Sequence, residues 1–230
     1  MKTIGLIGGM SFESTVTYYQ VINETVRREL GGLHSAKIIV NSIDFESIAR
    51  AQEEDDWDYC ADVMVEAAKA LEKAGAQILL IGANTMHICA ERLEEEMDIP
   101  LLHIADATIR RLKEDGVKKT ALLGTKYTLL RDFYKKRILD AGIGVLIPEK
   151  DIDAVNAIIY DELCAGIISE ASKKKLLEII AEMKEKGAEA VILGCTELDL
   201  LVKEEDSPLR VYDTTLIHGE EAALWSIRDE

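Results

Sequence analysis

The chain is poor in positive charge. Its 230 residues include 27 Lys and Arg against 43 Asp and Glu, which gives a formal net charge of −16 at pH 7. Proteins that bind nucleic acid hold the phosphates with clustered Lys and Arg side chains, and the sequence displays no such cluster. We therefore expect no nucleic-acid partner, and any anionic ligand would have to be held by local contacts.

Long apolar runs are also missing. No run approaches the ~18 residues of a membrane span, although 48% of the residues are hydrophobic. Residues 1–3 lead directly into a short apolar stretch, whereas a signal peptide needs a charged region followed by a longer apolar one. We expect a cytoplasmic protein with a sizeable core and no membrane partner.

The cysteines lack the spacing of a metal site or a disulfide framework. None of the four, Cys60, Cys89, Cys164 and Cys195, belongs to a CxxC pair, so neither a zinc site nor a set of disulfides is predicted. Cysteines of this kind are usually small buried side chains, and we expect this for Cys60, Cys89 and Cys164. The glycines at 5–9 match neither GxGxxG nor a Walker loop, so nucleotide binding has no specific support.

The sequence does contain an internal repeat. Residues 73–85, KAGAQILLIGANT, return at 185–197 as EKGAEAVILGCTE, and residues 4–11 are echoed by 120–127 in the same order. Any α/β protein has several apolar strands that end in glycine, but two pairs in the same order favour a duplication. Each copy of the first pair reads as a helix end, a glycine, a buried strand and a small polar turn. We predict two similar halves.

Short apolar runs alternate with amphipathic stretches along the chain. Runs that are apolar throughout are typical of a parallel sheet covered on both faces. We predict an α/β fold of two similar open parallel-sheet domains related by pseudo-twofold symmetry, with the site at the domain interface. The expected domains are residues 1–98 plus about 213–230, and residues 99–212. The expected strands are 3–8, 37–42, 77–82, 101–104, 120–124, 144–147, 190–194 and 211–212, and helices 15–30, 57–74 and 173–186 should each stop at a glycine.

The loops that follow the strands are the candidate site. In open parallel sheets, ligands bind beyond the carboxyl ends of the strands. The loops 8–13, 42–45, 82–87, 124–128, 194–198 and 213–218 are rich in small polar residues, whose backbone amides suit a carboxylate or a phosphate. Cys195 stands where the first copy of the repeat has Ala83. Helix-terminal amides can favour a thiolate at such a place, so Cys195 is a candidate proton-transfer base.

Five motifs carry a family resemblance. They are GGMSFEST at 8–15, GANTMH at 82–87, LGTKYT at 123–128, GCTE at 194–197 and DTTLIH at 213–218. With them the chain resembles the PLP-independent aspartate/glutamate racemases along nearly its whole length, and the GCTE form is similar to the aspartate racemase branch. In that family two cysteines, one from each domain, flank the α-carbon of the amino acid, and no cofactor is needed.

The resemblance implies a racemase with one catalytic thiol. Cys195 corresponds to one of the two cysteines, and the other would stand at Ala83, which cannot exchange a proton. Some relatives carry threonine there and favour one enantiomer, so we expect racemisation of aspartate or glutamate that can be one-directional or of low activity. Bound water or Thr85 is the expected substitute acid. The resemblance also implies a homodimer and no cofactor, and no metal is expected because the sequence has no ligand-spaced His/Cys cluster.

The resemblance further implies how the substrate is held. Arg50 and Gln52 are expected to recognise the side-chain carboxylate, although Arg50 could instead be a solvated helix residue. We expect Glu197 to orient the Cys195 turn, and His87 and His218 to be structural or supporting groups. Any single polar residue among the expected substrate-binding residues could instead only cap a helix. The expected substrate-binding residues are Met10, Ser11, Arg50, Gln52, Asn84, Thr125, Thr128, Glu162, Thr196 and Glu197.

Two alternatives remain open at this point. A decarboxylase or isomerase of the same superfamily can also work on a dicarboxylate with cysteine chemistry, and release of CO₂ from a malonate would reveal the decarboxylase. With one acid missing, the cleft could also bind an acidic amino acid without converting it. Absence of deuterium incorporation at Cα would favour such a binder.

Overall fold

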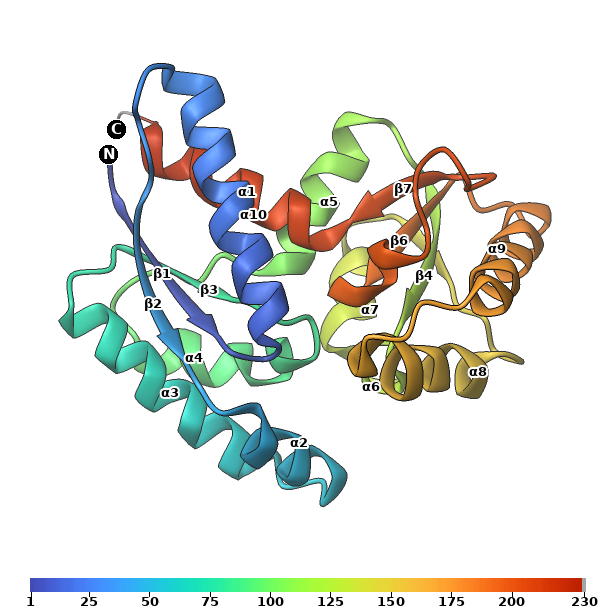
Figure 1. The fold of residues 1–230 in the computed structure, drawn as a ribbon, viewed down its shortest axis with the longest axis horizontal. Coiled ribbons are helices and arrows are strands. Elements are labelled where there is room, and N and C mark those ends of the chain that lie inside the picture. Colours follow the sequence, from blue (N-terminus) through green and yellow to red (C-terminus); the bar gives the residue numbers. More distant parts are fainter. Residues whose placement is uncertain (229–230) are drawn as a thin grey trace. The chain divides into compact units, whose positions relative to one another are not determined.

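Two parallel sheets organise residues 1–228, the part of the chain that the computed structural model describes (Figure 1). One unit consists of Met1–Ile104 and the segment that begins at Thr215, and the other of Ala105–Thr214. The first boundary follows residue 104 instead of the expected residue 98, and the second follows residue 214 instead of residue 212. The first boundary differs because residues 101–104 stay attached to the first unit, where the Leu102 amide donates to the Leu79 carbonyl over 2.9 Å.

The first unit has the strand order β2-β1-β3, with every pair parallel. Leu79 and Ile81 of β3 pack in one core with α3, whereas Ile78 and Leu80 pack in a second core with α1 and α10. Because both faces of the sheet are covered, its strands are apolar without alternation. The elements are β1 (Thr3–Gly8), α1 (Phe12–Leu30), β2 (Lys37–Ser42), α2 (Phe45–Glu53), α3 (Trp57–Lys73), β3 (Ile78–Ile81), η1 (Thr85–Cys89), α4 (Ala90–Glu96) and α10 (Thr214–Ile227).

The second unit has the order β5-β4-β6-β7, again parallel throughout. Leu123 and Leu193 face a core shared with α9, which contributes Leu176, Ile180 and Met183. The elements are α5 (Ile104–Glu114), β4 (Lys119–Gly124), α6 (Lys126–Leu130), α7 (Asp132–Asp140), β5 (Gly144–Leu146), α8 (Ile152–Ala157), the π-turn η2 (Ile158–Glu162), η3 (Leu163–Ala165), α9 (Glu170–Glu185), β6 (Ala190–Gly194), η4 (Thr196–Leu200) and β7 (Arg210–Asp213).

The duplicated sequence folds in the same way twice. The order β2-β1-β3 recurs as β5-β4-β6. At the end of β3, a Cβ on Gly82 would lie 3.1 Å from the Ile7 carbonyl oxygen, and at the end of β6 a Cβ on Gly194 would lie 2.8 Å from that of Leu123. Both glycines therefore permit the same close approach of neighbouring strands immediately before residues 83 and 195.

Most elements expected from the sequence are present, with one clear error. Residues 101–104 form a single bridge, from Leu101 to Leu79, and α5 already begins at Ile104. The run has the apolar composition of a strand, but its backbone turns into a helix after two ladder bonds. The predicted glycine ends of α3 and α9 are confirmed, since Gly75 and Gly187 have φ of 98° and 92°, a conformation that favours glycine.

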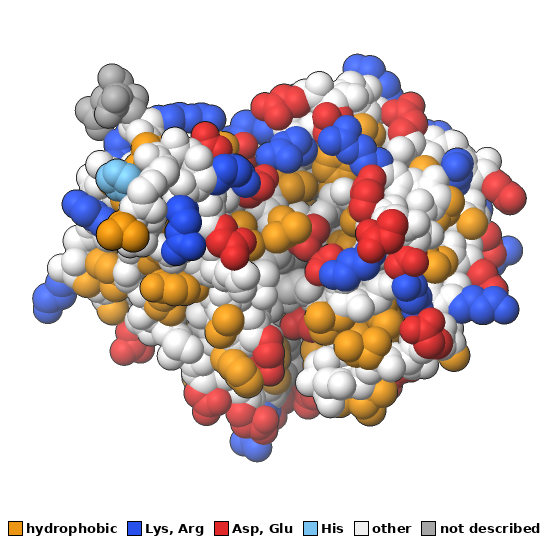
Figure 2. Space-filling model, turned by 45° about the horizontal axis from the view of Figure 1, so that its top comes forward, with side chains coloured by type: hydrophobic (Ala, Val, Ile, Leu, Met, Phe, Trp, Pro, Cys, Tyr) orange, Lys and Arg blue, Asp and Glu red, His pale blue; other side chains and the backbone are white. Residues whose placement is uncertain are grey.

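The excess negative charge is dispersed over the helices. Acidic and basic side chains are interspersed on the face shown in Figure 2. In the first unit, Arg92 pairs with Asp62 and also with Glu96, which in turn binds Lys69. Exposed pairs of this kind contribute little to stability. Within residues 1–228, no helix has the length and apolar character needed to cross a membrane.

Candidate active site

Cys195 lies directly after β6 in an extended conformation, with φ of −150° and ψ of 135°. Its side chain is half-buried. The thiol donates to Glu197 Oε2 over 3.0 Å, and the Thr196 hydroxyl donates to the same oxygen over 2.6 Å. One carboxylate oxygen therefore organises the side chains of all three residues of this turn.

The surroundings of Cys195 favour the neutral thiol. Burial raises its pKa well above the usual range, and the Glu197 carboxylate raises it further by its charge and by accepting the S–H bond, while the Glu197 backbone amide opposes the shift. The Glu197 amide favours the thiolate, as expected for an amide at such a turn, but burial and the carboxylate outweigh it. The same carboxylate is, however, a proton acceptor within hydrogen-bonding distance of the sulfur.

Tyr160 is a neighbour of this turn that the sequence did not reveal. It lies half-buried in the π-turn η2, and π-turns often mark functional sites. Burial raises the pKa of its phenol, and Cys195 and Glu197 are close enough to raise it further. The phenol is therefore an uncharged donor near the thiol. The i→i+5 backbone pattern has no signature in the sequence, which reads here as ordinary helix.

The remaining cysteines differ from one another. Cys60 and Cys89 are buried as expected, and burial raises the pKa of Cys89 to about 12. The expectation of burial is wrong for Cys164, which is exposed. It lies in the short 3₁₀ turn η3, which packs against η4 of the Cys195 turn. In this turn Leu163 is the buried side chain, and Cys164 stays on the surface.

Ala83 follows β3 in the first unit, two residues after Ile81, at the place that matches Cys195 in the repeat. Its exposed fraction is 9%, and it packs with Ile81 and Met86 in the core that includes α3. Its carbonyl oxygen lies 2.8 Å from His87 Nδ1. Asn84 is buried and Thr85 is half-buried at the start of η1.

Small hydroxyl side chains shape the loops after β1 and β4. Ser11 caps α1 by accepting from the Ser14 amide over 3.3 Å, and Thr125 caps α6 by accepting from the Thr128 amide over 3.4 Å. Met10 is buried beside the first of these caps. The helix-capping alternative is therefore realised for Ser11 and Thr125, and their contact with a substrate stays a prediction.

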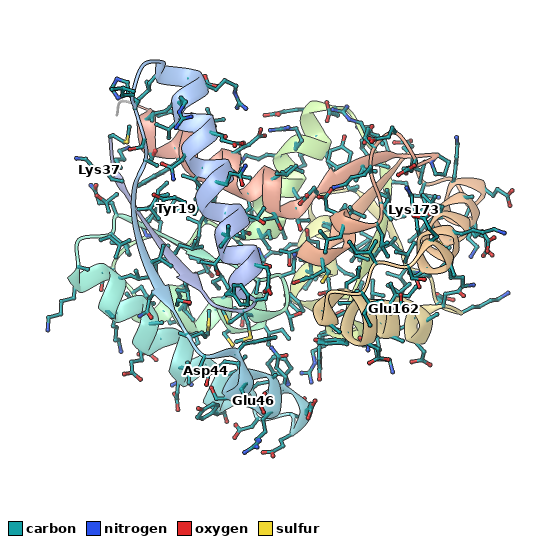
Figure 3. All side chains as sticks on the ribbon, viewed as in Figure 1. Tyr19, Lys37, Asp44, Glu46, Glu162 and Lys173 are labelled. Carbon is teal, nitrogen blue, oxygen red and sulfur yellow. The ribbon has the colours of Figure 1, made fainter. Side chains whose placement is uncertain are left out.

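Arg50 lies on the exposed face of α2, at a groove of about 380 Å³. The groove is also lined by Asp44 and Glu46, which Figure 3 shows near the start of that helix. Gln52 points the other way and is 5% exposed, with its amide nitrogen 3.1 Å from Met86 Sδ. These two residues therefore do not share one cavity, and recognition of a carboxylate by either stays a prediction.

Glu162 is engaged locally. Its carboxylate accepts from the Ser172 hydroxyl over 2.5 Å, which ties η2 to the first turn of α9; Glu162 is labelled in Figure 3. The structure thus gives Glu162 a structural role, and its contact with a substrate remains a prediction. Among residues 1–228, no group of three or more His, Cys, Asp or Glu side chains is placed to hold a metal ion.

Comparison with known proteins identifies the family. The family model for Asp/Glu/hydantoin racemases matches residues 7–222. The chain belongs to this racemase family. A proposed Asp/Glu racemase from Yersinia pestis has 46% sequence identity and a TM-score of 0.94, with 99% of this chain and 100% of that chain covered. An aspartate racemase homologue from Pyrococcus horikoshii OT3 has 34% identity and a TM-score of 0.87 over 99% and 100% of the two chains.

A curated relative is similar over the same length. The broad specificity amino-acid racemase RacX of Bacillus subtilis (strain 168) is 23% identical over 220 residues, which is 92% of each chain. The family resemblance read from the five motifs is therefore confirmed, as is the α/β fold with two parallel sheets. By its family the chain is an amino-acid racemase.

Proposed function

We propose that this racemase inverts aspartate or glutamate without a cofactor, using the Cys195 thiol to exchange the Cα proton. The observation that carries the proposal is the 3.0 Å hydrogen bond from Cys195 to Glu197. A neutral thiol cannot remove a weakly acidic Cα proton, but a thiol beside a carboxylate can first pass its own proton to that group. Glu197 thus serves as the proton acceptor that activates Cys195.

The proposed reaction consists of four proton transfers. The Cys195 S–H proton moves to Glu197, and the resulting thiolate takes the Cα proton and becomes a thiol again. The electron pair left on Cα takes a proton from a water molecule on the other face, or from Thr85 backed by water. Glu197 finally returns its proton to the hydroxide, so that the enzyme regains its starting state.

The acidic substrate is proposed from the cationic and small polar groups of the expected loops. Arg50 is an exposed guanidinium without an ion pair among the described residues, and such a group matches a side-chain carboxylate in geometry and charge. Asn84, Thr85, Thr125 and Thr196 would hold the α-carboxylate and the amino group. A homodimer and a cytoplasmic location, both expected from the sequence, stay predictions.

The substrate proposal is tested with both enantiomers of aspartate, glutamate and alanine. Protein treated with a chelator and freed of PLP is incubated with each, and the enantiomers are separated by chiral chromatography. We expect conversion of at least one acidic amino acid and none of alanine, because alanine offers no side-chain carboxylate. Conversion only after PLP or zinc is restored would contradict the proposed chemistry.

Ala83→Cys is expected to increase racemisation, most strongly in one direction. A thiol at the repeat-matching position would supply the second proton-transfer group, and such a group is typically worth roughly 10²–10⁴-fold. The added sulfur is a modest change in a packed site, so melting temperature is measured together with initial rates for both enantiomers. A folded variant with no gain in either direction would show that residue 83 does not serve the reaction.

A further inference from the structure

A buried histidine holds the backbone of the turn that carries Ala83. His87 is 1% exposed, and its Nδ1 lies 2.8 Å from the Ala83 carbonyl oxygen. On the other side of the ring, Nε2 accepts a bond from the Ile104 amide over 3.2 Å. Because a carbonyl only accepts and an amide N–H only donates, the neutral ring carries its proton on Nδ1.

The bond to Ala83 sets the direction of the peptide group between residues 83 and 84. In a trans peptide the N–H points opposite to the C=O, and this peptide is not among the cis bonds of the described chain. With the Ala83 carbonyl held by the imidazole, the Asn84 N–H points away from His87. That amide belongs to the small polar turn that follows β3.

The second unit has no such imidazole at the matching position. Repeat symmetry pairs residue 87 with Asp199, whose carboxylate binds Lys203 over 2.6 Å. The Cys195 carbonyl instead accepts from the backbone amide of Leu198 over 3.3 Å. The histidine is therefore a feature of the half that lacks the thiol.

His218 is a second buried histidine that supports the same region, and the two hydrogen bonds described for it go to Leu102 and Tyr18 rather than to Ala83. Its Nε2 donates to the Leu102 carbonyl over 2.8 Å, and its Nδ1 accepts from the Tyr18 hydroxyl over 2.8 Å. Its ring centroid lies 5.9 Å from that of His87. Loss of either histidine removes the two buried hydrogen bonds described for it, but the Ala83 carbonyl bond belongs to His87 and not to His218. This makes His218 the matched control.

We propose that His87 is a positioning residue of the racemase, which aims the Asn84 N–H so that it binds the α-carboxylate of the substrate. This inference rests on the proposed function. The imidazole acts only through the Ala83 peptide and does not touch the substrate. A hydrogen bond to a charged carboxylate is stronger than one between neutral groups, so misdirecting this one amide weakens binding substantially.

Three variants separate positioning from general stability. His87→Asn places its amide nitrogen near the position of Nδ1 and keeps a donor for Ala83, whereas His87→Gln moves the amide beyond it. We expect His87→Gln to raise KM for the acidic amino acid by roughly 10–100-fold. The KM values of His87→Asn and His218→Asn should stay within about threefold of the parent value. We expect all three variants to have a lower melting temperature, because each loses a buried hydrogen bond.

The outcomes distinguish this inference from the function on which it rests. If the parent converts an acidic amino acid and His87→Gln changes KM no more than His218→Asn, His87 is merely structural and the inference fails alone. If the parent neither binds nor converts any acidic amino acid, both fail. Nitrogen NMR of labelled histidine adds a readout besides activity. We expect the ring proton on Nδ1 of His87 and on Nε2 of His218. A proton on Nε2 of His87 would overturn the inference.

Discussion

Cys195→Ala is expected to lower racemisation of the acidic amino acid by roughly 10²–10⁴-fold, the usual contribution of a positioned proton-transfer group. The side chain is half-buried at the end of β6, and alanine fits the extended backbone there. The fold should therefore survive, which circular dichroism and melting temperature would verify. Rates are measured with both enantiomers by chiral chromatography.

Cys164→Ala provides the matched control for this loss. Cys164 is also a cysteine of the second unit, but it is exposed and lies in η3 rather than at a strand end. We expect its replacement to change the rate by less than about threefold. If Cys195→Ala retained activity at the level of Cys164→Ala, Cys195 would not be the proton-transfer group.

Glu197→Gln is expected to have two opposite effects. Racemisation should fall by roughly 10²-fold, because the amide cannot take the proton of the thiol. Alkylation of Cys195 by iodoacetamide near neutral pH should become faster. The carboxylate raises the pKa of Cys195 in the parent, so its removal lowers that pKa and, at a fixed pH, enlarges the thiolate fraction about tenfold for each unit by which the pKa falls.

The two effects are measured on the same samples. Mass spectrometry follows alkylation of Cys195, and Cys164, which is exposed, reports any general change in reagent access. Glu197→Asp serves as the charge control, because it keeps a carboxylate and should keep slow alkylation. Slower alkylation in Glu197→Gln would mean that the carboxylate does not hold the thiol in its neutral form. An unchanged racemisation rate would remove Glu197 from the mechanism.

Much of the fold could be predicted from the sequence, because hydrophobic pattern and glycine position are local signals. The sequence pattern predicts the carboxyl ends of the strands that stop at Gly8, Gly124 and Gly194, as the structure has them. It does not predict the backbone of residues 101–104, because an apolar run that makes one bridge and then enters a helix has the composition of a strand. Burial alone does not specify the backbone path.

The candidate site was only partly predictable for the same reason. Motifs located Cys195 and Glu197, but the sign of the pKa shift at Cys195 depends on burial and on the direction of the Glu197 side chain, which are tertiary properties. Tyr160 and the bond from His87 to Ala83 were not foreseen in these roles. Contacts through a π-turn or to a backbone carbonyl leave no trace in residue spacing.

The central claim is that a single thiol, Cys195, exchanges the Cα proton while position 83 offers no partner for it. Proton NMR of each enantiomer of the converted amino acid in D₂O tests it most directly, since it records loss of the Cα–H signal while chiral chromatography records inversion in the same sample. We predict that one enantiomer loses its Cα–H faster than it inverts, and that this exchange disappears in Cys195→Ala. Equal rates of exchange and inversion from both enantiomers, or exchange that persists in Cys195→Ala, would contradict the account.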